Sequence, residues 1–178
     1  MTGPRSPMNR PLGLRSLERG FTLIELLVTV TVAVILLSVA VPAFDGVTLS
    51  SRLNAYTTSL VAASQLARSE AIKRNASVTL CASADGSTCA TDGHWEAGWI
   101  VLSGATVLRQ QPAAANGYLM REAGGVSSLS YDATGIGVTQ ASITVCRATP
   151  TLGSQERVVK ISATGRTSIT STTLGACA

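Results

Sequence analysis

An apolar segment at residues 21–44 sets the strongest limit on what this chain can fold into. It reads FTLIELLVTVTVAVILLSVAVPAF and contains a single charged residue, Glu25, close to its start. About 20 consecutive apolar residues are enough for a helix to cross the hydrocarbon core of a bilayer. An ionised carboxylate in that core costs roughly 2.5–3.5 kcal/mol on insertion scales, so Glu25 needs a partner that neutralises it.

The residues before this segment carry positive charge. Four arginines and one acid, Glu18, precede the apolar run, and Gly20 is the last residue before it. Because positive flanks stay in the cytoplasm, the rest of the chain is expected on the other side of the membrane. Cleavage after Gly20 would give Phe21 a free amino group. That amine could neutralise Glu25 of a neighbouring copy shifted by about one helical turn.

The junction RGFTLIELL at 19–27 resembles the leader junction of type IV pilins and of the pseudopilins of type II secretion systems. In that superfamily a prepilin peptidase cuts after the glycine and methylates the new terminal phenylalanine. The resemblance implies cleavage between Gly20 and Phe21, methylation of Phe21, and an assembly role for Glu25. The family also has a proline inside the hydrophobic segment, where this chain has Pro42.

Two other interpretations of the apolar segment make different predictions. A secretory signal peptide would be cut near Ala40, but its apolar core usually has only about 7–15 residues. A plain single-pass anchor explains the length and orientation, but it gives no reason for a carboxylate one turn inside the membrane edge. We therefore predict a leader peptide at 1–20, which is removed, and a transmembrane helix at 21–44.

After Pro42 the pattern changes from apolar on all sides to apolar on one side. Apolar residues recur at steps of three and four, the spacing of one helix face. They are Leu49, Leu53, Tyr56, Leu60, Ala63 and Ala67. Lys73 and Arg74 suit the negative C-terminal end of a helix, and Asn75 suits its C-cap. We expect the transmembrane helix to continue as an amphipathic half at 45–75.

Beyond Asn75 the chain is rich in Gly, Ser and Thr, and short β-type runs alternate with turn residues. The candidate strands are 78–82, 98–102, 106–109, 127–131, 142–146, 158–162 and 167–170. We predict an α+β fold in which the long N-terminal transmembrane and stalk helix packs on an antiparallel β-sheet head at 76–178. Trp99 is expected in the core of the head, whereas Trp95 fits either the core or a ligand site.

Four cysteines in an exported domain are most simply two disulfides. The preferred pairing joins Cys81 to Cys89, which closes a short loop, and Cys146 to Cys177, which ties the C-terminus to a strand. Zinc binding is the competing interpretation, but neither pair has C-x-x-C spacing and His94 is the only histidine. We therefore predict no metal and no cofactor.

A second resemblance lies in the exported part. QLARSEAIKRN at 65–75, VTLC at 78–81 and GWIV at 98–101 are similar to the GspH/FimT group of minor pilins and pseudopilins. The resemblance implies a structural and priming subunit of a type IV pilus, held in the bacterial inner membrane with a periplasmic head. The group's alternatives are pseudopilin H of the type II secretion system and a pilus-borne DNA-binding subunit for uptake in natural transformation. Expected partners are other major and minor pilins or pseudopilins, the prepilin peptidase and the inner membrane.

The C-terminal region bears on the DNA-binding alternative. DNA-binding members carry a motif resembling Gly-Arg-x-Arg, but here Gly165 and Arg166 are followed by Ser168 in place of the second arginine. From residue 133 onward one acid, Glu156, accompanies four bases, which are Arg147, Arg157, Lys160 and Arg166. A patch of these bases would bind phosphates without reading sequence. Scattered cations on a solvated strand face are the competing interpretation, since no aromatic residue for stacking follows Tyr131.

Net charge adds no evidence for nucleic acid, and catalysis has little support. The formal charge of +4 falls to +1 without the leader, which holds four arginines and one glutamate. A serine nucleophile needs a base, but His94 has no identifiable orienting partner. Glu70 and Arg74 stand four apart on the helix, as an ordinary surface ion pair does. We expect no enzyme activity and no small-molecule substrate; the chain is instead a substrate of the prepilin peptidase.

Overall fold

The computed structural model describes residues 20–137, 139–149, 153 and 155–173. Residues up to Val41 and residues from Pro42 onward form two compact units. One helix, α1 (Leu23–Arg74), begins in the first unit and ends in the second. The predicted leader at 1–20 lies outside the described residues except for Gly20.

The N-terminal part of α1 has the length and composition of a membrane-spanning helix. Its most apolar window of 18 residues has a mean hydropathy of 2.6, and none of that window is buried inside the protein. Its large apolar side chains are exposed, among them Leu23, Ile35 and Leu37. A surface of this kind is stable in contact with lipid or with other apolar helices, and it is unfavourable in water.

The C-terminal half of α1 buries one broad face in the second unit. The buried residues are Leu49, Leu53, Thr57, Leu60, Ala63, Ser64, Ala67 and Ala71. Every residue of the predicted apolar stripe is therefore buried except Tyr56, which is partly buried. Two polar residues share this face because their hydroxyls have partners. Thr57 donates to the carbonyl of Leu53 at 2.9 Å, and Ser64 lies 2.5 Å from the Tyr131 hydroxyl.

Asn75 ends α1 as the sequence predicts. Its backbone is in the left-handed region, with φ of 50°, a conformation that asparagine tolerates better than most residues. The Asn75 N–H donates to the Ile72 carbonyl at 3.3 Å, and the Ala76 N–H donates to the Ala71 carbonyl at 3.2 Å. This pair of bonds is a Schellman motif, which satisfies carbonyls that the last helical turn leaves free.

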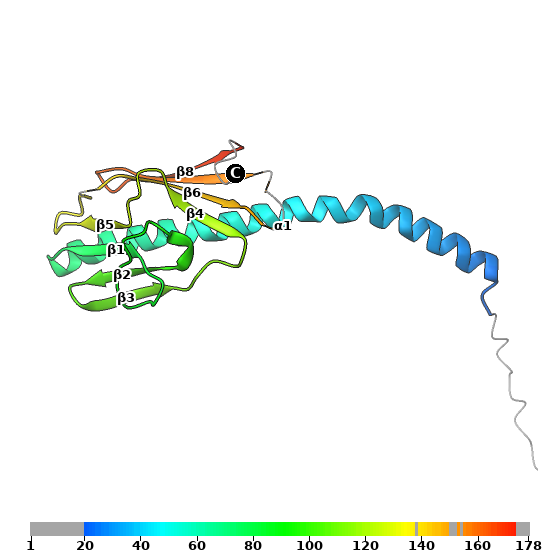
Figure 1. Cartoon of the computed structure of the whole chain (residues 1–178), viewed down its shortest axis with the longest axis horizontal. Helices are drawn as coiled ribbons and strands as arrows, with labels where there is room; N and C mark the ends of the chain where they lie inside the picture. The colour runs from blue at the N-terminus through cyan, green and yellow to red at the C-terminus, as the bar shows by residue number, and fades with distance from the viewer. Residues whose placement is uncertain (1–19, 138, 150–152, 154, 174–178) are drawn as a thin grey trace, which may run out of the picture. The chain divides into compact units, whose positions relative to one another are not determined.

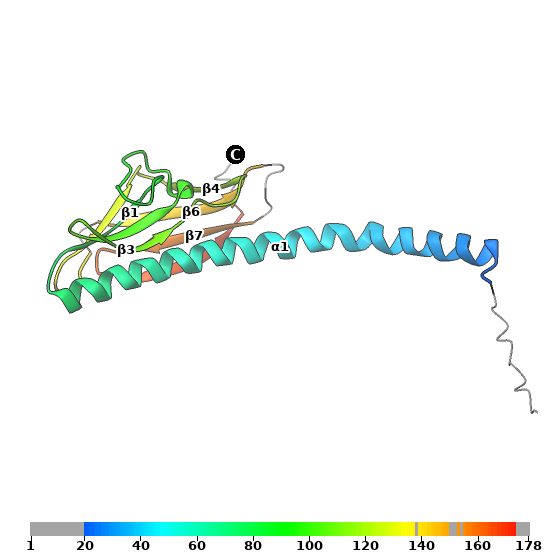
Figure 2. The same cartoon turned by 90° about the horizontal axis from the view of Figure 1, so that it is seen from below.

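The strands of the second unit form two antiparallel sheets (Figure 1). The first has the order β3-β2-β1-β5, with β1 at Val78–Ala82, β2 at Trp99–Ser103, β3 at Thr106–Gln111 and β5 at Ser128–Tyr131. The second has the order β4-β6-β7-β8, with β4 at Tyr118–Glu122, β6 at Ala141–Arg147, β7 at Glu156–Ile161 and β8 at Thr167–Thr172. Figure 2 shows both sheets on the same side of the C-terminal half of α1.

The head therefore has two sheets where the sequence suggested one, and β4 was missed. Both sheets contribute to one core: Leu80 and Val101 come from the first, and Ile143 and Val159 from the second. The face of α1 can serve both because it is several residues wide. β4 escaped the sequence analysis because its YLMRE sequence has two adjacent charges and no clear alternation of polar and apolar residues.

Both tryptophans belong to the core. Trp99 is buried in β2, as predicted. Trp95 begins a short 3₁₀ turn, η1 (Trp95–Ala97), and it is also fully buried. Its indole N–H donates to the carbonyl of Val126 at 2.9 Å, which satisfies the polar atom of the ring. Trp95, which the sequence placed either in the core or at a ligand site, is therefore a core residue.

One predicted disulfide is present between described residues. Cys81 of β1 is bonded to Cys89 and closes the loop that follows the strand. Cys146 of β6 is also disulfide-bonded. Its predicted partner, Cys177, lies outside the described residues.

Candidate functional site

The start of α1 is the first candidate site, and its geometry explains the local role of Glu25. Thr22 precedes the helix, and its carbonyl accepts the first helical bond from the Leu26 N–H at 3.1 Å. The Thr22 hydroxyl accepts the Glu25 N–H at 3.3 Å. Threonine followed by glutamate three residues later is the pattern of a capping box, and the carboxylate lies at the positive end of the helix. Glu25 therefore suits the first turn of α1 even in an isolated subunit.

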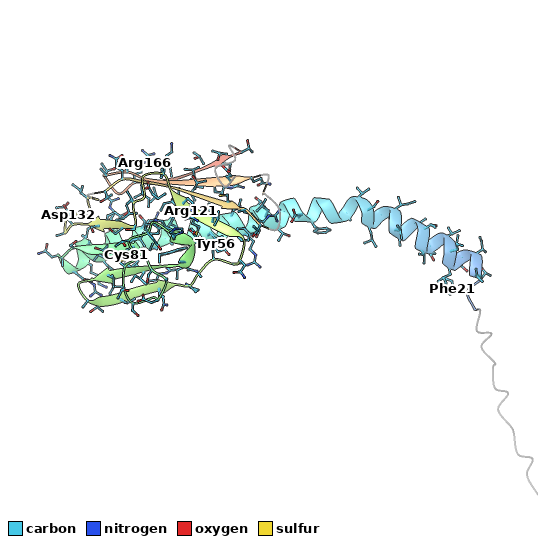
Figure 3. The ribbon with its side chains drawn as sticks, in the orientation of Figure 1. Phe21, Tyr56, Cys81, Arg121, Asp132 and Arg166 are labelled. Atoms are coloured by element: carbon cyan, nitrogen blue, oxygen red, sulfur yellow. A yellow bond between two sulfur atoms is a disulfide. The ribbon has the colours of Figure 1, made fainter. Side chains whose placement is uncertain are left out.

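The predicted cleavage junction lies immediately before this turn. Phe21 is 78% exposed and is labelled ahead of α1 in Figure 3. Gly20 is exposed, and a Cβ atom added to it would meet no atom within 4 Å. No basic side chain of the described residues pairs with Glu25. The helical conformation of α1 continues through Pro42.

The four bases predicted as a patch do not lie together. Arg147 donates two parallel hydrogen bonds to Asp45 of α1, from Nη1 to Oδ1 and from Nη2 to Oδ2, each 2.9 Å long. Its side chain is only 13% exposed. Arg147 therefore links the end of β6 to α1 through an ion pair, in the bidentate geometry that guanidinium and carboxylate groups favour.

Arg157 also faces the helix. It is buried, and it donates from Nε to the Asn54 side-chain oxygen and from Nη2 to the Ser50 hydroxyl, both at 3.1 Å. Arg157 and Lys160 are three residues apart on β7, so their side chains point to opposite faces of the sheet. The prediction of one four-residue patch was wrong for this reason. Lys160 and Arg166 are exposed.

Two of the four predicted bases, Lys160 and Arg166, instead form a basic surface together with Arg68. Lys160 and Arg166 line a hollow of about 580 Å³ over the outer side of the β4-β6-β7-β8 sheet. Arg166 also lines a second hollow of about 630 Å³, together with Arg68 of α1. None of the three forms a salt bridge within the part of the chain that the structure describes. We call Arg68, Lys160 and Arg166 the basic face; Figure 3 shows Arg166 beside β8.

Arg68 was not predicted as part of this surface. It belongs to the helical stretch 65–75, and only the packing of the β7–β8 turn against α1 brings Arg166 near it. The turn approaches the helix closely at Gly165. A Cβ atom added to Gly165 would lie 3.3 Å from the Arg68 side chain and 3.2 Å from the Tyr131 ring. No local sequence signal links two residues so far apart in the chain.

The acids of the loop before β2 are engaged in local contacts. Asp85 accepts the N–H groups of Ser87 and Thr88 at 2.8 Å, and these bonds hold its pKa far below the ordinary value. Glu96 accepts from Arg121 at 3.1 Å and lies 2.9 Å from the His94 ring. Among the described residues, no group of three or more His, Cys, Asp or Glu side chains is arranged to hold a metal ion. These contacts order the loop and the start of η1.

Comparisons with known proteins agree with this architecture. The family described as "Type II transport protein GspH" matches residues 57–165, and the "Prokaryotic N-terminal methylation motif" matches residues 15–41. A crystal structure of the type IV minor pilin FimU of Pseudomonas aeruginosa is 25% identical, with a TM-score of 0.55 over 68% of this chain and 90% of FimU. A second crystal form of FimU is 26% identical to this chain, with a TM-score of 0.52 over 66% of this chain and 92% of the FimU chain. No curated protein sequence matches significantly.

The contact of Asp45 with Arg147 generates a testable pH dependence. The hydrogen bond from Arg147 lowers the pKa of Asp45 below its ordinary value. The pair therefore stabilises the head fully above about pH 4, the ordinary pKa of aspartate, and this stabilisation is lost as pH falls through the lowered native pKa. We predict that Arg147→Gln lowers the urea midpoint of the full chain in neutral detergent at pH 7.

The fluorescence of buried Trp95 and Trp99 reports this unfolding. The difference between Arg147→Gln and the unmodified chain should shrink as pH falls below about 4. Arg109→Gln is the matched control, because Arg109 is exposed on β3 and has no salt bridge among the described residues. A loss of stability that stays constant from pH 7 to pH 3 would contradict the role given to the ion pair.

Proposed function

Because the chain belongs to the GspH family of minor pilins and pseudopilins, we propose that it is a structural and priming subunit of a type IV pilus. The observation that carries this proposal is the similarity of this chain to a type IV minor pilin, FimU, over 90% of the FimU chain in the crystal structure. The alternative is pseudopilin H of the type II secretion system, which the description of the matching family favours. The similarity to FimU favours the pilus.

The first step of the proposed function is processing in the inner membrane. The methylation motif matches 15–41, a range that includes Gly20, Phe21 and Glu25. This match supports cleavage by the prepilin peptidase between Gly20 and Phe21, followed by methylation of the new amino group. The exposure of both residues is consistent with access by the enzyme. The basic leader would remain in the cytoplasm, and the head would enter the periplasm.

The second step is assembly, in which Glu25 receives a partner from another subunit. Within the described residues Glu25 has no basic partner of its own, and an unpaired carboxylate in the bilayer is unfavourable. The amine of Phe21 in a neighbouring subunit would supply the missing charge. Pro42 and Gly46 would let α1 bend or loosen during extraction, because a proline inside a helix removes one backbone hydrogen bond.

We predict that Glu25→Gln enters the membrane normally and is not incorporated into fibres. Glutamine serves in a capping box almost as well as glutamate, so this variant keeps the local role at the helix start and removes only the charge. The measurement compares the amounts of subunit in the membrane fraction and in sheared fibres. Thr29→Val, one turn further along the same helix, is the control and should be incorporated. Normal incorporation of Glu25→Gln would show that the charge is not the assembly determinant.

A second candidate function is DNA binding during uptake, and the basic face favours it. Arg68, Lys160 and Arg166 are exposed cations without salt bridges inside the described part of the chain. They border two neighbouring hollows that share Arg166. Contacts of this kind would recognise phosphate charge and not base sequence, because binding would come from counterion release.

We predict that the full chain in neutral detergent retards duplex DNA in a gel, with an affinity that falls steeply as salt rises. Each of Arg68→Gln, Lys160→Gln and Arg166→Gln should weaken binding and reduce the salt slope by about 0.9. Arg109 is an exposed cation of the other sheet, so Arg109→Gln should change neither the DNA affinity nor its salt slope. An absence of retardation at low salt would remove this candidate function and leave the pilin assignment intact.

A further inference from the structure

The hollow beside Lys160 is an open depression on the surface of the head. It lies over the end of the β4-β6-β7-β8 sheet where β6 begins and β7 ends. Its volume of about 580 Å³ falls within the range of roughly 300–1,000 Å³ typical of pockets for organic ligands. A bare inorganic ion would leave most of this space empty. The lining therefore has room for a ligand of several polar groups.

Three adjacent strands place a row of polar side chains in this hollow. Ser142 of β6 is in register with Lys160 of β7, which is in register with Ser168 of β8. Directly opposed residues of antiparallel strands have Cβ atoms about 5 Å apart and lie on the same face. The Cβ atom of Lys160 therefore lies between those of two serines on the same face of the sheet. The side-chain amide of Gln140 adds a further donor and acceptor at the edge.

Glu122 is the carboxylate among the described residues of the lining, and its oxygens accept backbone N–H groups. Glu122 Oε2 accepts the backbone N–H groups of Gly124 at 2.6 Å and Val126 at 2.8 Å, and its Oε1 accepts the Ser142 N–H at 3.1 Å. Glu122 forms no salt bridge among the described residues. These bonds order the chain after β4 and the start of β6, but they do not remove the charge of Glu122. With Lys160 and Arg166, the described lining therefore has a net charge of +1.

Arg166 is held in place by its backbone. Its N–H donates to the Ser162 hydroxyl at 3.1 Å, and its carbonyl accepts the Ser162 N–H at 3.0 Å. Its guanidinium makes no salt bridge within the described ranges. The main chain at Arg166 is ordered, and its exposed guanidinium is available to a ligand. Binding therefore orders the side chain but not the backbone.

We propose that this hollow binds a carboxylated sugar, the uronic-acid unit of an anionic polysaccharide. The carboxylate of such a unit complements Lys160 and Arg166, and its ring hydroxyls complement the hydroxyl and amide groups of Ser142, Ser168 and Gln140. None of the described residues that line the hollow is aromatic, so an unpaired nucleobase would have no surface on which to stack. The lining therefore favours an acidic sugar over a single nucleotide, while the phosphates of duplex DNA would contact Lys160 and Arg166 without any stacking. This inference goes beyond the role in the fibre and does not depend on it.

The test is calorimetric titration of the full chain in neutral detergent with D-glucuronate, and separately with glucose and with inorganic phosphate. We expect saturable binding of glucuronate, weaker binding of inorganic phosphate and no binding of glucose. Lys160→Gln and Arg166→Gln should each weaken glucuronate binding by about tenfold, a change of about 1.4 kcal/mol. Arg68→Gln is the matched control, because Arg68 lines only the other hollow and its loss should leave glucuronate binding unchanged. Near-ultraviolet circular dichroism verifies that each variant is folded.

A double variant, Ser142→Ala with Ser168→Ala, separates the contributions of hydroxyl groups and charge. It should weaken glucuronate binding several-fold and leave phosphate binding unchanged, whereas Thr170→Ala, on the same face of β8, should change neither. Four results would overturn the proposal: no saturable binding of glucuronate, equal binding of glucose, equal binding of inorganic phosphate, or a dependence on Arg68 as strong as that on Lys160. A short oligothymidylate that binds through Lys160 where glucuronate does not would assign the hollow to nucleic acid.

Discussion

The burial of one face of α1 is the constraint on which the head depends. Residues from Leu49 to Ala71 belong to one core to which both sheets also contribute. Because the inner faces of both sheets turn toward this helix, the alternation along each strand decides which side chains point inward. Arg147 and Arg157 are drawn into contacts with α1, and Lys160 is left outside. The basic face is a consequence of this packing.

The sequence predicted the features that depend on local patterns. Spacing of three and four residues identified the buried face of α1, and the preference of asparagine for left-handed backbone identified the end at Asn75. Seven of the strands were found near their observed positions, because β-type runs alternate with turn residues. The division into two sheets could not be predicted, since it rests on pairing between distant strands. The same holds for Arg157, which fell outside its predicted strand, and for Arg68.

The two ends of the chain carry different parts of the proposed function. At the N-terminus, Glu25 occupies the capping-box position after Thr22, and its backbone N–H donates to the Thr22 hydroxyl. Its proposed role in pairing between subunits depends instead on the negative charge of its side chain. In the head, exposed cations lie on a surface that the internal salt bridges do not use. Assembly and recognition can therefore vary independently in this chain.

In the proposed assembly, processing creates a charged amine on Phe21, and this amine neutralises Glu25 of another subunit. The intact mass of the protein recovered from membranes and from sheared fibres tests it most directly. We predict the mass of residues 21–178 with one added methyl group and with the four cysteines oxidised to two disulfides. A chain that retains its first 20 residues, or one that begins after Ala40, would contradict the account, because neither could present that amine.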